Sequence, residues 1–323
     1  MVGIPNSTFY PSHQEFTLLG FPGFLKFRRL LFILFFLLFI IIILTNSVII
    51  HTVRKASSMH APMYILISLL SITYICSATN ILPKMLLGFL FDKNQIILIG
   101  CLIQMFFIYF LSMMDCNVLL MMALDRYIAI YKLLSYHIIM TRRMLVYLTV
   151  ASFIRASTVN FCGSNTIHHF ACEHMALMGL ACGNVAKNKV AGLSLRVISM
   201  IADLSFLSIS YGSIIWAASK ISTGTLRHKA LHTCGTHILV LSVVYFFRLS
   251  SSVMYWISKS VTQDTHNLLS AAYLLVPALI NPLIYGLGLP DIRKYYWACH
   301  LTRLTNICQY SHFIEHCTIA SNL

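Results

Sequence analysis

The sequence predicts an all-α membrane protein, a seven-transmembrane-helix bundle with a shortened fourth helix and a short C-terminal surface helix. Of its 323 residues, 58% are hydrophobic and only 10% are charged, a balance typical of chains that cross a bilayer several times. The apolar residues gather in runs of about 20, enough to cross a hydrocarbon core of ~30 Å as a helix. The chain is long enough for about seven such helices joined by short loops.

The net charge of +14 indicates a lipid partner and no nucleic acid. The basic residues lie in short loops between apolar runs, where anionic headgroups and the positive-inside bias place them. Residues 1–29 lack a basic segment followed by an apolar core, so we expect no cleavable signal peptide and assign them to an extracellular N-terminus. The sequon Asn6-Ser7-Thr8 makes Asn6 a predicted glycosylation site if this end is lumenal.

The first two spans are predicted over residues 30–50 and from the segment at residues 60–64 to about Leu90. Arg54 and Lys55 directly follow the first span and favour the cytoplasm for that side, although basic residues on the other flank weaken this bias. Pro62 opens the second span, where its missing N–H costs nothing because the first N–H groups of a helix are unpaired anyway.

The third span runs from Cys101 to Tyr131 and ends in Asp125-Arg126-Tyr127. Charged groups at the edge of an apolar helix are often anchors that reach for the interface. Asp115 interrupts the apolar run, and no charged partner for it is apparent from the sequence. Burial of an unpaired carboxyl group would favour its protonated form.

The fourth span is predicted to be short, from Met144 to Phe161, about 18 residues. Arg155 interrupts it, at a cost of about 2.5–3.5 kcal/mol if held at mid-depth. A helix this short must tilt less, thin the bilayer or draw its loop inward. It is either a tolerated short helix or a damaged one, and we favour the second.

The fifth span is predicted over residues 191–217, the sixth opens at Lys229, and the seventh covers about 268–287. Pro282 is expected to kink the seventh helix, with Asn281 able to bond the freed backbone. These boundaries give a receptor domain at 30–287 and a cytoplasmic tail at 288–323, in which PDIRKYYW is the predicted surface helix.

Four cysteines are predicted to face an oxidising lumen: Cys101, and three in one loop, Cys162, Cys172 and Cys182. They are enough for two disulfides, with three possible pairings between which the sequence does not choose. The loop contains no CxxC or HxxxH pair, so we expect no metal site and no cofactor.

Five segments, in this order, carry a family resemblance: PMYILISLLS, MALDRYIAI, SISYGSIIW, KALHTCGTH and NPLIY. Together they resemble the olfactory receptors, a branch of the rhodopsin-like G-protein-coupled receptors. The loop FCGSNTIHHFACEHMALMGLACGN resembles that of the fish-like class I branch, which implies the disulfides Cys101–Cys172 and Cys162–Cys182.

The resemblance implies an odorant receptor of the plasma membrane that senses small volatile molecules and activates a stimulatory olfactory-type heterotrimeric G protein. In such a switch, Arg126 would hold the closed state through Asp125 and then swing toward two tyrosines. The residues that match the family's G-protein switch are Asp125, Arg126, Tyr127, Tyr211, His237, Asn281, Pro282 and Tyr285.

The chain also departs from the family. Tyr74 stands where the family has an aspartate that shares a sodium site with the acid equivalent to Asp115, so sodium binding is not expected. This departure and the short fourth span leave open a decayed receptor that folds poorly or does not signal. A transporter or channel is less favoured because there is no inverted repeat, and an enzyme because there is no nucleophile–base or HExxH signature.

The resemblance also places a ligand pocket between the third and sixth helices and the long loop. Class I relatives often bind carboxylic acids through a basic residue at a position that here is Trp256. Arg248, about two turns deeper, could replace that anchor through planar bidentate donors; alternatively, it pairs internally or faces a water-filled gap. The predicted lining is Met105, Ile108, Tyr109, Ser112, His174, Arg248, Ser252 and Trp256.

Overall fold

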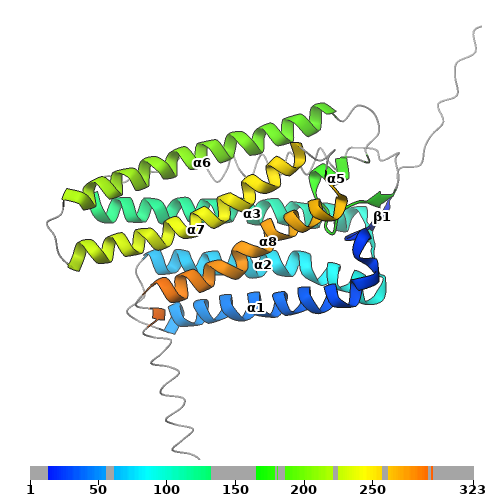
Figure 1. The fold of residues 1–323 in the computed structure, drawn as a ribbon, viewed down its shortest axis with the longest axis horizontal. Helices are drawn as coiled ribbons and strands as arrows, with labels where there is room; N and C mark the ends of the chain where they lie inside the picture. The colour runs from blue at the N-terminus through cyan, green and yellow to red at the C-terminus, as the bar shows by residue number, and fades with distance from the viewer. Residues whose placement is uncertain are drawn as a thin grey trace, which may run out of the picture.

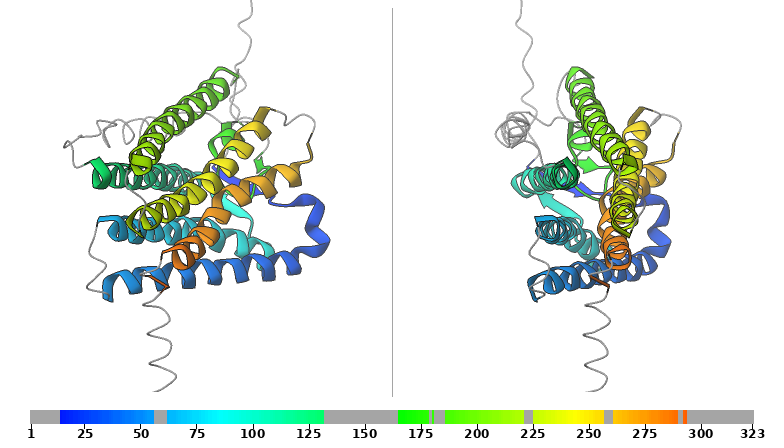
Figure 2. Two further views of the ribbon diagram at one scale, coloured as in Figure 1. Left: turned by 60° about the vertical axis from the view of Figure 1, so that its left-hand side comes forward. Right: turned by 90° about the vertical axis from the view of Figure 1, so that its left-hand side faces the viewer.

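The structure, a computed structural model, describes residues 14–55, 62–131, 165–178, 180, 186–220, 225–256, 261–289 and 292–293. Within these residues, six long helices lie in one bundle (Figures 1 and 2). They are α1 (Arg28–Lys55), α2 (Pro62–Phe91), α3 (Leu98–Tyr131), α6 (Ala186–Lys220), α7 (Thr225–Trp256) and α8 (Gln263–Gly288).

The packing order of the helices follows from their contacts. α3 contacts α2, α6 and α7, while α8 lies against α1, α2 and α7. In Figure 1 the orange α8 accordingly runs between the blue α1 and the yellow α7. The main apolar core lies where these helices meet, so polar side chains that point inward on α2, α3, α7 and α8 share one buried region.

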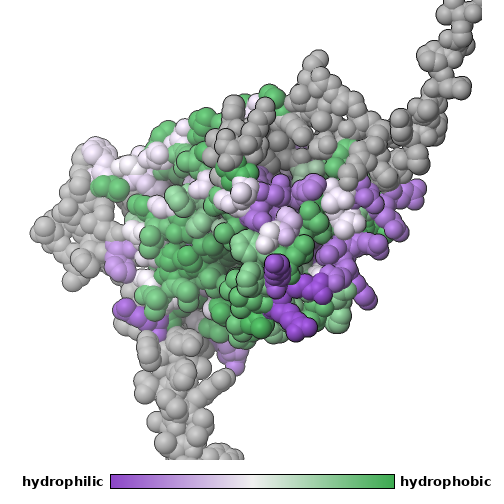
Figure 3. Space-filling view, turned by 45° about the vertical axis from the view of Figure 1, so that its right-hand side comes forward, coloured by the Kyte–Doolittle hydropathy of each residue, from purple (hydrophilic) through white to green (hydrophobic). Residues whose placement is uncertain are grey.

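The described helices make this a multi-pass membrane protein. Five are long and apolar enough to cross a bilayer, over Pro22–Lys55, Pro62–Phe91, Leu98–Asp125, Cys234–Val253 and Gln263–Gly288, and α6 carries a shorter apolar stretch, Val197–Ser213. Figure 3 shows hydrophobic side chains in a broad belt across the bundle, as a protein immersed in lipid requires. The predicted fourth span with Arg155, and most of the predicted surface helix, lie outside the described residues.

A small sheet closes one end of the bundle, where the sequence predicted only helices. Its strands are β1 (Glu15–Leu18), β2 (Gln95–Ile97) and β3 (Thr166–Ile167), in the order β2-β1-β3. β1 pairs antiparallel with β2 and parallel with β3. The helical fold class holds, and this short sheet is an addition that the sequence analysis did not predict, because β1 is held by these partners while its local sequence lies in a largely polar segment.

The alternation of side chains in β1 explains how the sheet packs. Phe16 and Leu18 are buried on one face, whereas Glu15 is exposed, as expected for a strand with one face covered. A second apolar cluster lies beneath this face, made of Phe16, Leu18, Cys101, Leu102, Met105, Ile167, Cys172 and Leu177. We call this end, with the sheet and this cluster, the cap end, and the opposite end, which holds Asn281 to Tyr285, the NPxxY end.

Two short helices complete the described cap end. The 3-10 helix η1 (Pro22–Phe27) leads from the sheet into α1. Its Gly23 N–H donates to the carboxylate of Asp264 at the start of α8. The short helix α5 (His174–Met178) follows the disulfide loop.

Candidate ligand and signalling sites

A disulfide fixes the loop to the start of α3. The sulfur atoms of Cys101 and Cys172 lie 2.05 Å apart, and both residues are fully buried. This confirms the pairing implied by the resemblance. Cys162, Cys182 and Asn6 lie outside the described residues, so the second disulfide and the glycosylation site stay predictions.

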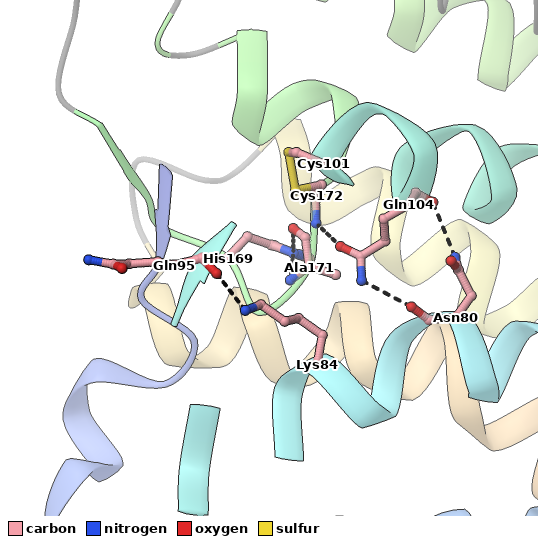
Figure 4. The surroundings of a disulfide bond; sticks show 8 residues. All are labelled: Asn80, Lys84, Gln95, Cys101, Gln104, His169, Ala171 and Cys172. Atoms are coloured by element: carbon pink, nitrogen blue, oxygen red, sulfur yellow. Dashed lines mark hydrogen bonds between the residues drawn. A yellow bond between two sulfur atoms is a disulfide. The ribbon is translucent and has the colours of Figure 1, made fainter. Parts of the chain in front are cut away.

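Gln104, one helical turn after Cys101, joins three parts of the chain (Figure 4). Its Nε2 donates to the carbonyl of Asn80 on α2 at 3.0 Å, and its Oε1 accepts the N–H of Cys172 at 2.9 Å. Asn80 Nδ2 returns a bond to the carbonyl of Gln104 at 3.1 Å. The disulfide is thus fixed by neighbouring hydrogen bonds that sequence analysis did not identify, although Gln104 is a polar residue in an apolar run.

His169 is a buried polar residue of the described loop, as is its neighbour Glu173. Its Nδ1 lies 2.9 Å from the carbonyl of Ala171, and its Nε2 lies 3.3 Å from the Glu173 carboxylate. Burial lowers the pKa of the His169 imidazole, and the nearby Glu173 opposes this only in part. Burial in the loop therefore favours the neutral form of the His169 imidazole.

At the NPxxY end, Tyr285 of α8 meets residues from α3 and α7. Its hydroxyl lies 3.5 Å from the sulfur of Met122 and 3.4 Å from Nδ1 of His237. The other ring nitrogen of His237 lies 3.3 Å from the sulfur of Met63 on α2. His237 and Tyr285 are each 2% exposed, so two predicted switch residues share one buried cluster.

The prediction for Asn281 was wrong in its partner. The ring of Pro282 removes the N–H that would bond the carbonyl of Ala278, and it is Asn46 of α1 whose Nδ2 donates to that carbonyl at 2.9 Å. Asn281 instead donates to the hydroxyl of Tyr74. The lone asparagine of the first apolar run was the available signal, because a polar side chain in a span needs a partner.

The remaining switch residues are described in part. Tyr211 is buried on α6 and lies close enough to Tyr285 to interact with it electrostatically. Asp125 is half-buried. The side chains of Arg126 and Tyr127 lie outside the described part of the chain, so the contact between Asp125 and Arg126 stays a prediction.

Asp115 was predicted to lack a partner, and the structure corrects this. Its Oδ2 lies 3.2 Å from Nη2 of Arg248 on α7, forming an ion pair between side chains that are 10% and 14% exposed. Arg248 is therefore paired internally, which was the alternative to a free ligand anchor. Sequence order did not reveal the pair because the two charges lie on different helices and meet only when α3 and α7 pack.

The guanidinium of Arg248 makes further bonds to α3. Nη2 also donates to the carbonyl of Ser112 at 2.9 Å and to its Oγ at 3.2 Å, while Nη1 donates to the sulfur of Cys116. The Ser112 hydroxyl also bonds that of Tyr273 at 2.8 Å, and the guanidinium lies 5.9 Å from the centre of the Tyr273 ring. That separation is within cation–π range.

Other polar groups surround this ion pair. Asp203 of α6, 7% exposed, lies beside Arg248, Cys116 and Tyr245. Among the described residues, Asp115 Oδ1 and Arg248 Nε lie buried without a hydrogen bond. The region thus holds one guanidinium and two carboxyl groups.

The other predicted pocket residues take different positions. Met105 belongs to the apolar cluster of the cap end, and Ile108 belongs to the main core. Tyr109 is partly buried and packs against the apolar cluster of the cap end. His174 is half-buried at the start of α5, and the buried Ser252 donates to the carbonyl of Arg248 at 2.9 Å. The side chain of Trp256 lies outside the described residues.

The described residues contain no group of three or more His, Cys, Asp or Glu side chains arranged to hold a metal ion. The bonds at both ends of the bundle are hydrogen bonds, ion pairs and sulfur contacts among the chain's own groups.

Comparison with known proteins identifies the family. The sequence profile of the family described as "Olfactory receptor" matches residues 35–301. Human olfactory receptor 52K1 is 33% identical over 291 residues, covering 87% of this chain and 93% of the relative. Human olfactory receptor 52P1 is 35% identical, covering 88% and 94%. Rat olfactory receptor 51E2 is 32% identical, covering 87% and 92%.

The fold also has a solved counterpart. The crystal structure of squid rhodopsin superposes with a TM-score of 0.64 and covers 87% of each chain at 13% identity. At that identity the likeness shows the fold alone, and the fold is that of the rhodopsin-like seven-helix receptors. The chain belongs to the olfactory receptor family of G-protein-coupled receptors: it is an odorant receptor and not an enzyme.

Proposed function

We propose that this receptor retains its activity and lies in the plasma membrane with its cap end outside the cell. Structural disulfides form in the oxidising secretory lumen, so the Cys101–Cys172 bond supports this orientation for the cap end. Residues 1–29, including the sequon at Asn6, then lie outside. The tail at 288–323 and the NPxxY end face the cytoplasm.

The observation that carries signalling is the buried meeting of Tyr285, His237 and Met122. The contacts of the Tyr285 hydroxyl are long, and one acceptor is a thioether, so little energy is lost when Tyr285 changes partners. A ligand that binds the open arrangement better would shift the population toward it. Arg126 would then leave Asp125 and move toward Tyr211 and Tyr285.

The partner on the cytoplasmic side is proposed to be a stimulatory olfactory-type heterotrimeric G protein. The ligand is a small odorant, and its proposed site lies between α3, α7 and the disulfide loop. Half-buried Tyr109 and Ser112 offer hydroxyl groups there, and His174 borders the loop side, while Met105, Ile108 and Ser252 are buried in the packing around the site.

The test is odorant-dependent cyclic AMP in cells that express the stimulatory G protein, with surface receptor measured in the same cells. The Arg126→Ala variant should lose the signal while odorant binding to purified receptor stays within about threefold. Arg29→Ala, at the exposed start of α1, is the matched control and should signal normally. Surface receptor that gives no signal with a broad odorant panel would contradict the proposal and favour a decayed receptor.

A further inference from the structure

The surroundings of Arg248 bear on the chemical class of the ligand. We propose that Asp115 determines ligand specificity. Its carboxylate neutralises Arg248 inside the bundle, so the site excludes carboxylate ligands and accepts small neutral molecules with a hydroxyl or carbonyl group. The inference rests on the proposed function, since it concerns the odorant site of the same receptor.

The hydrogen bonds of Arg248 leave no room for a carboxylate. A carboxylate is held best by two parallel N–H donors of one guanidinium. In this chain Nη2 donates to Asp115 and to both oxygens of Ser112, and Nη1 donates to Cys116. Only Nε of Arg248 has no hydrogen-bond partner among the described residues, so no complete two-donor edge is available to an incoming acid.

The charges around Arg248 also disfavour an acid. An incoming carboxylate at Arg248 would lie beside Asp115, which is 7% exposed, and near Asp203, also 7% exposed. Like charges that share a poorly solvated site repel strongly, so either the ligand or an aspartate would have to take up a proton. Because one guanidinium faces two carboxyl groups, the region offers no net positive charge to an acid.

The hydroxyl groups next to the ion pair indicate what the region can bind. The hydroxyl groups of Ser112 and Tyr273 form a neutral pair next to the ion pair, and both residues are half-buried. Each hydroxyl can donate or accept. An alcohol, aldehyde or ketone can exchange hydrogen bonds with this pair without placing a charge near Asp115.

The same geometry predicts a latent acid receptor. Asp115→Asn keeps the shape of the side chain and removes its charge, so Arg248 loses its directly paired carboxylate and then faces a single carboxyl group, that of Asp203. The matched control is Asp92→Asn, which neutralises the acid of another arginine–aspartate pair, Arg28–Asp92, at the exposed cap end.

The experiment measures binding of straight-chain acids and alcohols of equal length, from butanoic acid and butanol upward, to purified full-length receptor in nanodiscs. Binding is followed by thermal shift and signalling by cyclic AMP. Alcohols should bind wild-type receptor at least about tenfold more tightly than the matched acids. Asp115→Asn should lower this ratio at least about tenfold by strengthening acid binding, and Asp92→Asn should leave it unchanged.

Two results would overturn the inference: wild-type receptor that binds no alcohol better than its matched acid, or an Asp115→Asn ratio equal to that of wild type. If Asp115→Asn does not fold, the double variant Asp115→Leu, Arg248→Leu decides, because it leaves neither charge of the pair buried without its partner. Acid binding should be unchanged in that variant, and its loss would show that Arg248 already holds acids. Binding without any cyclic AMP response would contradict the proposed signalling, while the binding ratios would still decide the ligand class.

Discussion

The receptor contains two arginine–aspartate pairs that look alike in contact and differ in surroundings. Arg28 and Asp92 meet at the cap end, with 39% and 63% of their side chains exposed. Arg248 and Asp115 meet inside the bundle, with 14% and 10% exposed. Water and salt screen the first pair, so its net contribution is about 0–1 kcal/mol. Removing one partner of a buried pair costs about 3–5 kcal/mol, because a charge is left without compensation.

Burial, more than proximity, decides how much an ion pair contributes to stability. The exposed pair joins the start of α1 to the end of α2 and adds little beyond local order. The buried pair joins α3 to α7, so each charge needs a new partner if these helices separate. Four experiments test the comparison.

The largest effect is expected for Arg248→Leu. The variant leaves Asp115 buried without its cation and should lower the free energy of unfolding by about 3–5 kcal/mol, measured by thermal and denaturant unfolding of purified receptor. Arg28→Leu, the matched change at the exposed pair, should cost less than about 1 kcal/mol. The double variant Asp115→Leu, Arg248→Leu should recover most of the loss. Equal losses for the two single leucine variants would refute the comparison.

Gln104→Leu tests the intermediate case of a buried group without charge. It leaves the N–H of Cys172 and the carbonyl of Asn80 without their bonds, so a loss of about 1–3 kcal/mol is expected in the same unfolding measurements. Gln95→Leu is the control, because its side chain is exposed, and should change stability by about 0.5 kcal/mol or less. A Gln104 variant as stable as the control would mean that these bonds contribute nothing net.

Asp92→Asn should have a small effect that depends on salt. Loss of the exposed pair should cost about 0.2–1 kcal/mol at low ionic strength and nothing measurable in about 1 M salt. Asparagine is the right replacement because the backbone of Asp92 has a φ of 55°, in the left-handed region that Asp and Asn tolerate best after glycine. Asp92→Ala should therefore be less stable than Asp92→Asn at every salt concentration. A salt-independent cost for Asp92→Asn would contradict the electrostatic explanation.

The smallest effect concerns pH at the loop. Since burial lowers the pKa of His169, stability should be full above the ordinary histidine pKa of about 6.5. As the pH falls from there toward the lowered pKa, the unfolded chain takes up a proton that the native loop resists, and stability declines. His169→Gln should flatten this decline in unfolding midpoints measured across that range. His232→Gln, at an exposed position on α7, should not.

The helices were largely predictable, because a long apolar run specifies a span without knowledge of its neighbours. The second span was predicted to open within residues 60–64 and to end at about residue 90, and α2 covers Pro62–Phe91. The sheet was not predicted, because β3 has two residues and its pairing of Thr166 with Thr17 joins distant segments. Short strands of this kind are determined by tertiary contacts more than by local sequence.

The candidate sites were likewise predictable only in part. Motif residues such as His237 and Tyr285 could be named from sequence, and the structure places them in contact. The partners of Asp115 and Asn281 could not, because helix rotation decides which inward-facing polar groups meet. Asp115 and Arg248 stood out as charges within apolar runs, and their pairing needed the packed bundle.

The position of β1 has a consequence for biosynthesis. It is the central strand of the sheet, and β3 follows α3 in the chain. The sheet therefore cannot be completed until α1, α2 and α3 have been synthesised and residues 166–167 have emerged. An epitope tag fused close to Gln14 would crowd a strand whose two edges are both occupied, so a flexible spacer is needed there. Strand β1, made early on the ribosome, therefore reaches its final place only after α1, α2 and α3 have been made.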